Sequence, residues 1–166
     1  ALEAGDSVIT RDHGAQQVRW IGTTTVQATG DLAPIEIAAG AFGNTTPLLV
    51  SPQHRMLLSG WRCDMVAGTK EALAPAKHLI NDRDIRRAVG GTVAYIHLAF
   101  DQHEIITAGG VHSESFHPGH MALDALAMPT RAELLRLFPD VRVNTKSYGP
   151  SARPQVKPYE ARLIRP

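Results

Sequence analysis

Short stretches in which apolar and polar residues alternate dominate the chain before residue 120, and this pattern is typical of half-buried β-strands. The clearest stretch covers 92–100, where Val, Tyr, His and Ala alternate with Ala, Ile, Leu and Phe. The residues Asp101-Gln102 follow it and predict a two-residue turn. Residues 103–108 would then return as the second strand of a hairpin, and Gly109-Gly110 would end it.

Several shorter strands are expected earlier in the chain, each bounded by the turn-forming residues Gly, Pro, Asn or Asp. They cover 8–10, 17–21, 32–37, 48–50 and 55–58. A single helical turn or a bend is expected over 75–80. Many short strands broken in this way are typical of an all-β domain, which we expect to span residues 1–120.

The pattern changes after residue 119, where a small helical extension is expected over 121–166. A short helix would cover 121–127, and the capping-box sequence of 130–133 predicts the start of a second helix. Residues 144–158 are polar and interrupted by Gly and Pro, which is typical of a linker or an extended tail. Residues 160–164 would add an edge strand.

Composition and charge mainly exclude classes of function. The formal net charge is +1 and aromatic residues make up 5% of the 166 residues, which argues against a nucleic-acid-binding surface. The sequence contains no apolar run of about 18 residues and opens without the features of a signal peptide, so we expect no membrane segment.

The single cysteine, Cys63, fits a reducing compartment and a cysteine-poor exported protein equally well. Its segment resembles a loop, and we expect an unreactive thiol there.

A hydroxyl stands three residues before an imidazole in the turn Ser51-Pro52-Gln53-His54, between two apolar runs. A Ser side chain in such a turn can bond the backbone two residues on, while the His projects from the same turn. Because an unperturbed His titrates at about pH 6.5, an imidazole held in this way can donate a proton or a hydrogen bond near neutral pH. An ordinary strand-capping turn explains the same residues, and this alternative stays open here.

Further polar residues gather around the expected late hairpin. Asp101 and His103 flank its turn, and a carboxylate beside an imidazole can orient the ring and raise its basicity. Glu114 and Ser115 follow Gly109-Gly110, where the backbone can approach another group closely. A solvated hairpin end is the alternative interpretation.

The histidines His112, His117 and His120 raise a second alternative, a zinc site, because three imidazoles can hold this ion. The dipeptide Pro118-Gly119 would break any helix that placed His117 and His120 on one face. The sequence also lacks paired Cys ligands and an H-E-x-x-H motif. We therefore expect no metal and no cofactor.

Taken together, these segments resemble the Hint fold that inteins and hedgehog autoprocessing domains share, and above all the bacterial Hint_2-type group. The resemblance covers residues 1 to about 119. Five segments carry it, namely a strand entry of the type L-x-x-G-D-x-V-x-T at 2–10, the strand after it at 18–22, the T-x-x-H motif with Ser for Thr at 51–54, the A-x-x-L turn at 75–79 and the late hairpin at 95–111. It implies a mostly β horseshoe of short antiparallel strands.

The resemblance also implies roles for these residues. In the family, a Cys or Ser that opens the first strand attacks the carbonyl carbon before it and converts a peptide bond into a thioester or ester. His54 would bond the scissile amide and protonate its departing nitrogen. Ser51 would help to hold that peptide in a strained geometry. Asp101 and His103 would supply acid–base help near the junction.

The chain departs from the family pattern in two ways. The segment with the nucleophile is absent before Leu2, so we expect this form to be inactive and the intact parent to cleave its own upstream segment. Glu114 and Ser115 stand where inteins carry His-Asn, and Ser cannot cyclise, so full splicing is not expected. A missing strand would expose a sheet edge and favour a homodimer. A catalytically idle β scaffold in a large secreted or surface protein is the alternative.

Overall fold

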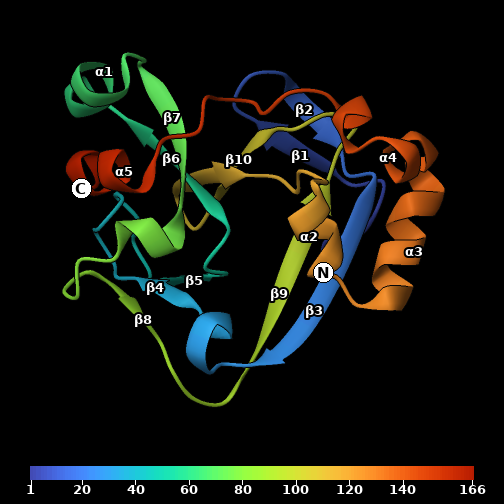
Figure 1. Cartoon of the computed structure of the whole chain (residues 1–166), viewed down its shortest axis with the longest axis horizontal. Coiled ribbons are helices and arrows are strands. Elements are labelled where there is room, and N and C mark those ends of the chain that lie inside the picture. Colours follow the sequence, from blue (N-terminus) through green and yellow to red (C-terminus); the bar gives the residue numbers. More distant parts are fainter. The chain divides into compact units, whose positions relative to one another are not determined.

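The structure is a computed structural model that describes residues 1–166 without a gap. Short antiparallel strands occupy the chain before residue 115, and four of the five α-helices follow residue 119 (Figure 1). The expected fold class, mostly β with a small helical C-terminal part, is confirmed. The chain forms two compact units, which are described one at a time. Unit 1 holds 1–24, 94–106 and 115–152, and unit 2 holds 25–93, 107–114 and 153–166.

Unit 1 is built around a β-hairpin and three helices. Its elements are β1 (Ser7–Thr10), β2 (Gly14–Gln17), the start of β3 (Trp20–Gln27), the end of β9 (Thr92–Ala99), the start of β10 (Ile105–Ala108), α2 (His120–Asp124), α3 (Met128–Leu137), α4 (Pro139–Val143) and the 3₁₀ turn η3 (Thr145–Tyr148). β1 pairs with β2 on one side and with β10 on the other. Gly14, with φ of 64°, closes the β1–β2 loop in the left-handed conformation that such hairpins favour.

The helices of unit 1 cover Trp20. Trp20, which is 1% exposed, lies in one core cluster with Ala99, with Leu126 from the loop after α2, and with residues from all three helices and η3: Leu123, Leu134, Val141 and Tyr148. The second helix was expected to begin at Thr130, but it begins at Met128 with Pro129 in its first turn. Proline suits this position, since it lacks the N–H that would be left unpaired and its φ is already helical.

The tail expected over 144–158 is packed in both units. In unit 1, residues 145–148 form η3, and the buried Tyr148 hydroxyl donates to the Phe100 carbonyl at 2.6 Å. In unit 2, Leu73 N–H donates to the Pro154 carbonyl, and Val156 N–H donates to the Leu73 carbonyl. The proline-rich composition therefore gives irregular backbone that is held by hydrogen bonds rather than a free linker.

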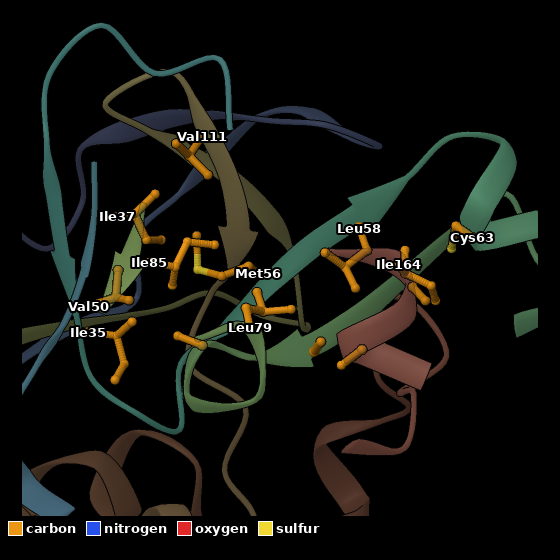
Figure 2. Packing of buried hydrophobic residues seen from close by; sticks show 14 residues of the cluster. Ile35, Ile37, Val50, Met56, Leu58, Cys63, Leu79, Ile85, Val111 and Ile164 are labelled. Carbon is orange, nitrogen blue, oxygen red and sulfur yellow. The ribbon is translucent and has the colours of Figure 1, made fainter. Parts of the chain in front are cut away.

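Unit 2 contains the larger core. Its elements are the end of β3, the start of β9, the end of β10, η1 (Gly30–Leu32), β4 (Ile35–Ile37), β5 (Leu48–Val50), β6 (Arg55–Ser59), α1 (Trp61–Ala67), β7 (Glu71–Pro75), η2 (Ala76–Leu79), β8 (Ile85–Arg87), β11 (Val111–Glu114) and α5 (Pro158–Ile164). β4 lies between β5 and β8, and β6 lies between β11 and β7. Figure 2 shows how Met56, Leu79 and Ile85, all at most 1% exposed, meet between these strands.

Residues 160–164 were expected to form an edge strand, but they belong to helix α5. Pro158 stands in the first turn, and the Glu160 carboxylate accepts the Lys157 N–H at 2.7 Å, which caps the helix. Ala161 and Ile164 then face the core of unit 2. The three-residue spacing of these apolar positions suits a helix, which the short alternating pattern had concealed.

The late hairpin is also placed differently from the prediction. β9 pairs with β3, whereas β10 is a neighbour of β1 and β11. The two-residue turn is Gly109-Gly110, which joins β10 to β11 with φ of 60° and 84°. Two successive positive φ values define the turn type that tight hairpins favour, and glycine adopts them without strain. Asp101-Gln102 has no residue of this kind.

Candidate functional site

The turn Ser51–His54 joins β5 to β6 in unit 2. The His54 N–H donates to the Ser51 carbonyl at 3.0 Å, so the backbone closes the turn. Pro52 stands at the second position, where its fixed φ suits this turn. The Ser51 hydroxyl, which was expected to bond the backbone, makes no hydrogen bond within the protein and is therefore available to another group.

The turn rests on η2, the second motif of the resemblance. The Ala76 N–H donates to the His54 carbonyl at 2.9 Å, and the Lys77 N–H donates to the Pro52 carbonyl at 3.0 Å. Two motifs separated in sequence are thus joined main chain to main chain. Because both bonds hold carbonyls inside the turn, main-chain contacts with η2 fix the backbone of His54.

Glu114 anchors the same turn from β11. Its Oε1 accepts the Arg55 N–H at 3.0 Å, and its Oε2 accepts the Arg55 Nη1 at 3.0 Å. The Glu114 side chain is 9% exposed and the Arg55 side chain 27%, so water screens this ion pair only in part. The structure thus brings Glu114 to the residue that follows His54, where it holds the backbone.

His103 lies in unit 1 and is 4% exposed. The Ala152 N–H donates to its Nδ1 at 2.9 Å, so Nδ1 must be the unprotonated nitrogen of a neutral ring. The proton of this tautomer is on Nε2, which is the nitrogen able to donate. The ring packs on His117 at 4.6 Å between centroids, and His117 Nε2 bonds the Gly149 carbonyl at 3.0 Å.

Asp101 and Ser115, the other two candidates in unit 1, have different surroundings. The Asp101 side chain is 76% exposed and contacts Arg19 Nε at 3.3 Å, rather than an imidazole. Ser115 is 2% exposed, and its hydroxyl accepts the Glu104 N–H at 2.9 Å. The Ser115 N–H donates in return to the Glu104 carbonyl at 2.8 Å. Ser115 therefore joins two backbone segments.

A second imidazole site in unit 1 is absent from the sequence prediction. His13 Nδ1 lies 2.9 Å and 3.0 Å from the two carboxylate oxygens of Glu104, which is 1% exposed. His13 stands in the β1–β2 loop, where its N–H donates to the Thr10 hydroxyl at 3.2 Å. The spacing Thr10-x-x-His13 repeats that of Ser51-x-x-His54 and could have identified this loop.

Cys63, expected in a loop, lies in helix α1 and is fully buried. Burial, followed by the negative charges of Asp64 and Glu71, raises the pKa of this thiol. A buried thiol with a raised pKa contains little thiolate, which is the reactive form. The position suits a packing residue of the unit 2 core.

No three His, Cys, Asp or Glu side chains in residues 1–166 lie close enough together to hold a metal ion. His112 bonds the Thr107 hydroxyl at 2.9 Å in unit 2, whereas His117 bonds Gly149 in unit 1. In the same residues, no helix has the length and apolar character that a membrane crossing requires.

Each unit thus offers an imidazole of distinct chemistry. His54 stands on a turn that main-chain bonds and an ion pair hold, and His103 is a neutral ring whose Nδ1 is engaged. Comparison with known proteins adds one match, to the family described as the Hint domain, over residues 1–120. No curated protein and no solved structure matches the chain.

Proposed function

Because the chain belongs to the Hint domain family, we propose that it is the autoprocessing part of a larger protein that cleaves a peptide bond in its own chain. The nucleophile of this reaction is a Cys or Ser that the parent carries before Ala1. The substrate is the parent's own upstream segment, so each molecule reacts once.

The proposed reaction is an acyl shift. The sulfur or oxygen of the nucleophile attacks the carbonyl carbon before it, and the C–N bond breaks. The thiol or hydroxyl proton passes to the departing nitrogen through the His54 imidazole, which leaves a thioester or ester. Water or an added thiol then attacks this carbonyl and releases the upstream segment. Proton transfer by a positioned imidazole accelerates such steps by about 10²–10⁴-fold.

The fixed backbone of the Ser51–His54 turn is the observation that carries this proposal. Its carbonyls bind η2 and its flanking residue binds Glu114, so the turn is rigid before any substrate binds. A rigid support for acid–base groups lowers the cost of reaching the transition state. The Ser51 hydroxyl makes no bond within the protein and is proposed to bind the scissile peptide.

We propose auxiliary roles for the remaining candidates. His103 donates a hydrogen bond through Nε2 near the junction. Glu114 positions the turn through Arg55, and Ser115 positions Glu104. Asp101, which is exposed and contacts Arg19, stays a prediction from the sequence.

The test is intact-mass spectrometry of the whole parent protein with and without added thiol. We expect two fragments, or a thiol adduct of the upstream one, and His54→Ala should slow their appearance by at least about 10²-fold. Gln53→Ala, which alters an exposed neighbour in the same turn, is the matched control and should cleave normally. A parent that stays whole with thiol present, or that cleaves at the same rate without the imidazole, would contradict the proposal.

A catalytically idle scaffold is the competing function. The buried Cys63 with its raised pKa and the structural bonds of Glu114 and Ser115 favour it, because three potentially reactive side chains are engaged in packing or positioning. The residue that opens the strand upstream of Ala1 in the parent separates the two functions. A Cys or Ser there supports processing, and any other residue supports the scaffold.

The expected homodimer also stays a proposal. β2 is the terminal strand of its sheet in unit 1, and terminal strands can pair with another chain. Sedimentation equilibrium of the chain would give a dimer mass if copies associate. A mass that stays monomeric at high concentration would contradict this proposal.

A further inference from the structure

The loop between β9 and β10 in unit 1 is held by a buried carboxylate. Glu104 is 1% exposed, and its two oxygens lie 2.9 Å and 3.0 Å from His13 Nδ1. Gln102 Nε2 donates to Glu104 Oε1 at 3.0 Å. A carboxylate removed from water is costly unless donors surround it, so these two partners determine whether Glu104 can stay buried.

The main chain of Glu104 is fixed as firmly as its side chain. Its N–H donates to the Ser115 hydroxyl at 2.9 Å, and its carbonyl accepts the Ser115 N–H at 2.8 Å. The residue immediately before it is His103. Any displacement of Glu104 would therefore move the backbone from which the His103 imidazole projects.

The side chains before and after His103 meet each other, whereas His103 contacts different residues. Gln102 and Glu104 bond each other beside His13. His103 receives the Ala152 N–H on Nδ1 and packs on His117. The group formed by His13, Gln102 and Glu104 therefore makes no use of the His103 ring, which has contacts of its own.

We propose that His13 and Glu104 are a positioning pair for His103. The pair keeps the loop in place so that Nδ1 of His103 accepts the Ala152 N–H, which leaves the ring proton on Nε2. The His13 side chain is 50% exposed while Glu104 is buried, so the imidazole both bonds the carboxylate and separates it from solvent. The consequence for cleavage rests on the function proposed above, whereas the positioning itself does not.

The first test uses the chain as it stands and measures the nitrogen resonances of His103 by ¹⁵N NMR at fixed neutral pH. The wild type should show the signature of an unprotonated, hydrogen-bonded Nδ1 and a protonated Nε2. His13→Ala should abolish this signature, because exchange between tautomers follows when the loop moves. His13→Asn should retain it, since the Asn amide can place an N–H where Nδ1 donates.

His120→Ala is the matched control, because it removes an exposed imidazole from the same unit and should leave the His103 signature unchanged. Circular dichroism of each variant verifies that it is folded. An unchanged His103 signature in folded His13→Ala would overturn the proposal. Loss of the signature in folded His13→Asn would also overturn it, since the donated hydrogen bond would then not be the means of positioning.

The second test is self-cleavage by the parent. His13→Ala should slow it by up to about 10²-fold, the cost of a catalytic group displaced by about 1 Å, and His13→Asn should restore most of the rate. If the wild-type parent does not cleave at all, the proposed function fails while the NMR result still decides the positioning pair. If the parent cleaves and His13→Ala cleaves as fast, positioning by this pair has no part in the reaction.

Discussion

The two loops with a hydroxyl three residues before an imidazole, Thr10–His13 in unit 1 and Ser51–His54 in unit 2, are built by opposite means. In the first, side chains provide the anchors, since the Thr10 hydroxyl accepts the His13 N–H and the imidazole itself binds Glu104. In the second, the backbone provides them, since the Ser51 carbonyl closes the turn and η2 holds its carbonyls.

Because of this difference, the side chains of the first loop hold the fold together, whereas those of the second can take part in a reaction. The Thr10 hydroxyl and the His13 Nδ1 are occupied in holding unit 1 together. The Ser51 hydroxyl makes no bond within the protein, and main-chain bonds hold the backbone of His54. Main-chain anchors keep an acid–base group in place whether or not its ring carries a proton, so the loop with backbone anchors is the one suited to reaction. Substitutions at matched positions should therefore affect stability in one loop and reaction rate in the other.

The largest expected effect on stability comes from removing Glu114, the side chain that binds Arg55 directly after the second loop. Glu114→Ala leaves the Arg55 N–H and guanidinium without their acceptor. Breaking a largely buried ion pair costs about 3 kcal/mol, and the measurement is the free energy of unfolding in urea. Glu114→Gln, which retains an acceptor for the Arg55 N–H, should lose about half as much. If Glu114→Ala unfolds like the wild type, the bonds between Glu114 and Arg55 contribute nothing measurable to the stability of the turn.

A matched pair of hydroxyl deletions gives the next effect in size. Thr10→Val removes a buried hydroxyl that accepts the His13 N–H and donates to the Gly14 carbonyl, so we expect a loss of about 2 kcal/mol. Ser51→Ala removes a half-buried hydroxyl with no bond in the protein, and the loss should be below about 0.5 kcal/mol. Urea denaturation measures both. Equal losses at the two positions would contradict the division between anchoring and reacting hydroxyls.

The sequence predicts the second loop better than the first, because the residues that form the second loop are neighbours in the chain. The turn at Ser51–His54 follows from four neighbouring residues, Pro52 among them, and needs no remote partner. The site at His13 exists only because Glu104, 91 residues away, approaches it. The Arg55–Glu114 pair likewise joins residues 59 apart. A local pattern indicates which residues turn, but only the folded chain determines which groups meet.

The fold shows the same limit. Alternation over 92–100 correctly indicates a strand, but the pattern is equally compatible with β10 or β3 as its partner, and the structure selects β3. Gly109-Gly110 could have indicated the true hairpin, because only glycine adopts two positive φ values in succession without strain. Helix α1 was missed although Cys63, Val66 and Ala67 follow the i, i+3, i+4 spacing of a helix and pack on the core of unit 2, because seven residues are too few to make such a period stand out.

The smallest expected effect is a pH dependence that enters through His78, on the η2 segment that supports the second loop. Burial, and then the positive charges of Lys77 and Arg162, lowers the pKa of His78. The unfolded chain takes up a proton below about pH 6.5, whereas the folded chain takes it up only at a lower pH. The unfolded state therefore binds more protons in that interval, and stability that is complete above about pH 6.5 is lost as the pH falls toward the folded-state pKa.

His78→Gln, which cannot take up this proton, should flatten the acid side of the stability profile and leave the profile above neutral pH unchanged. Urea denaturation at a series of pH values between about 5 and 8 measures this difference. His120→Ala is the control, because its imidazole is exposed and its removal should leave the acid slope as in the wild type. If His78→Gln loses stability at acid pH as the wild type does, another group causes this loss. The protonation of His78 then has no effect on the support of the second loop.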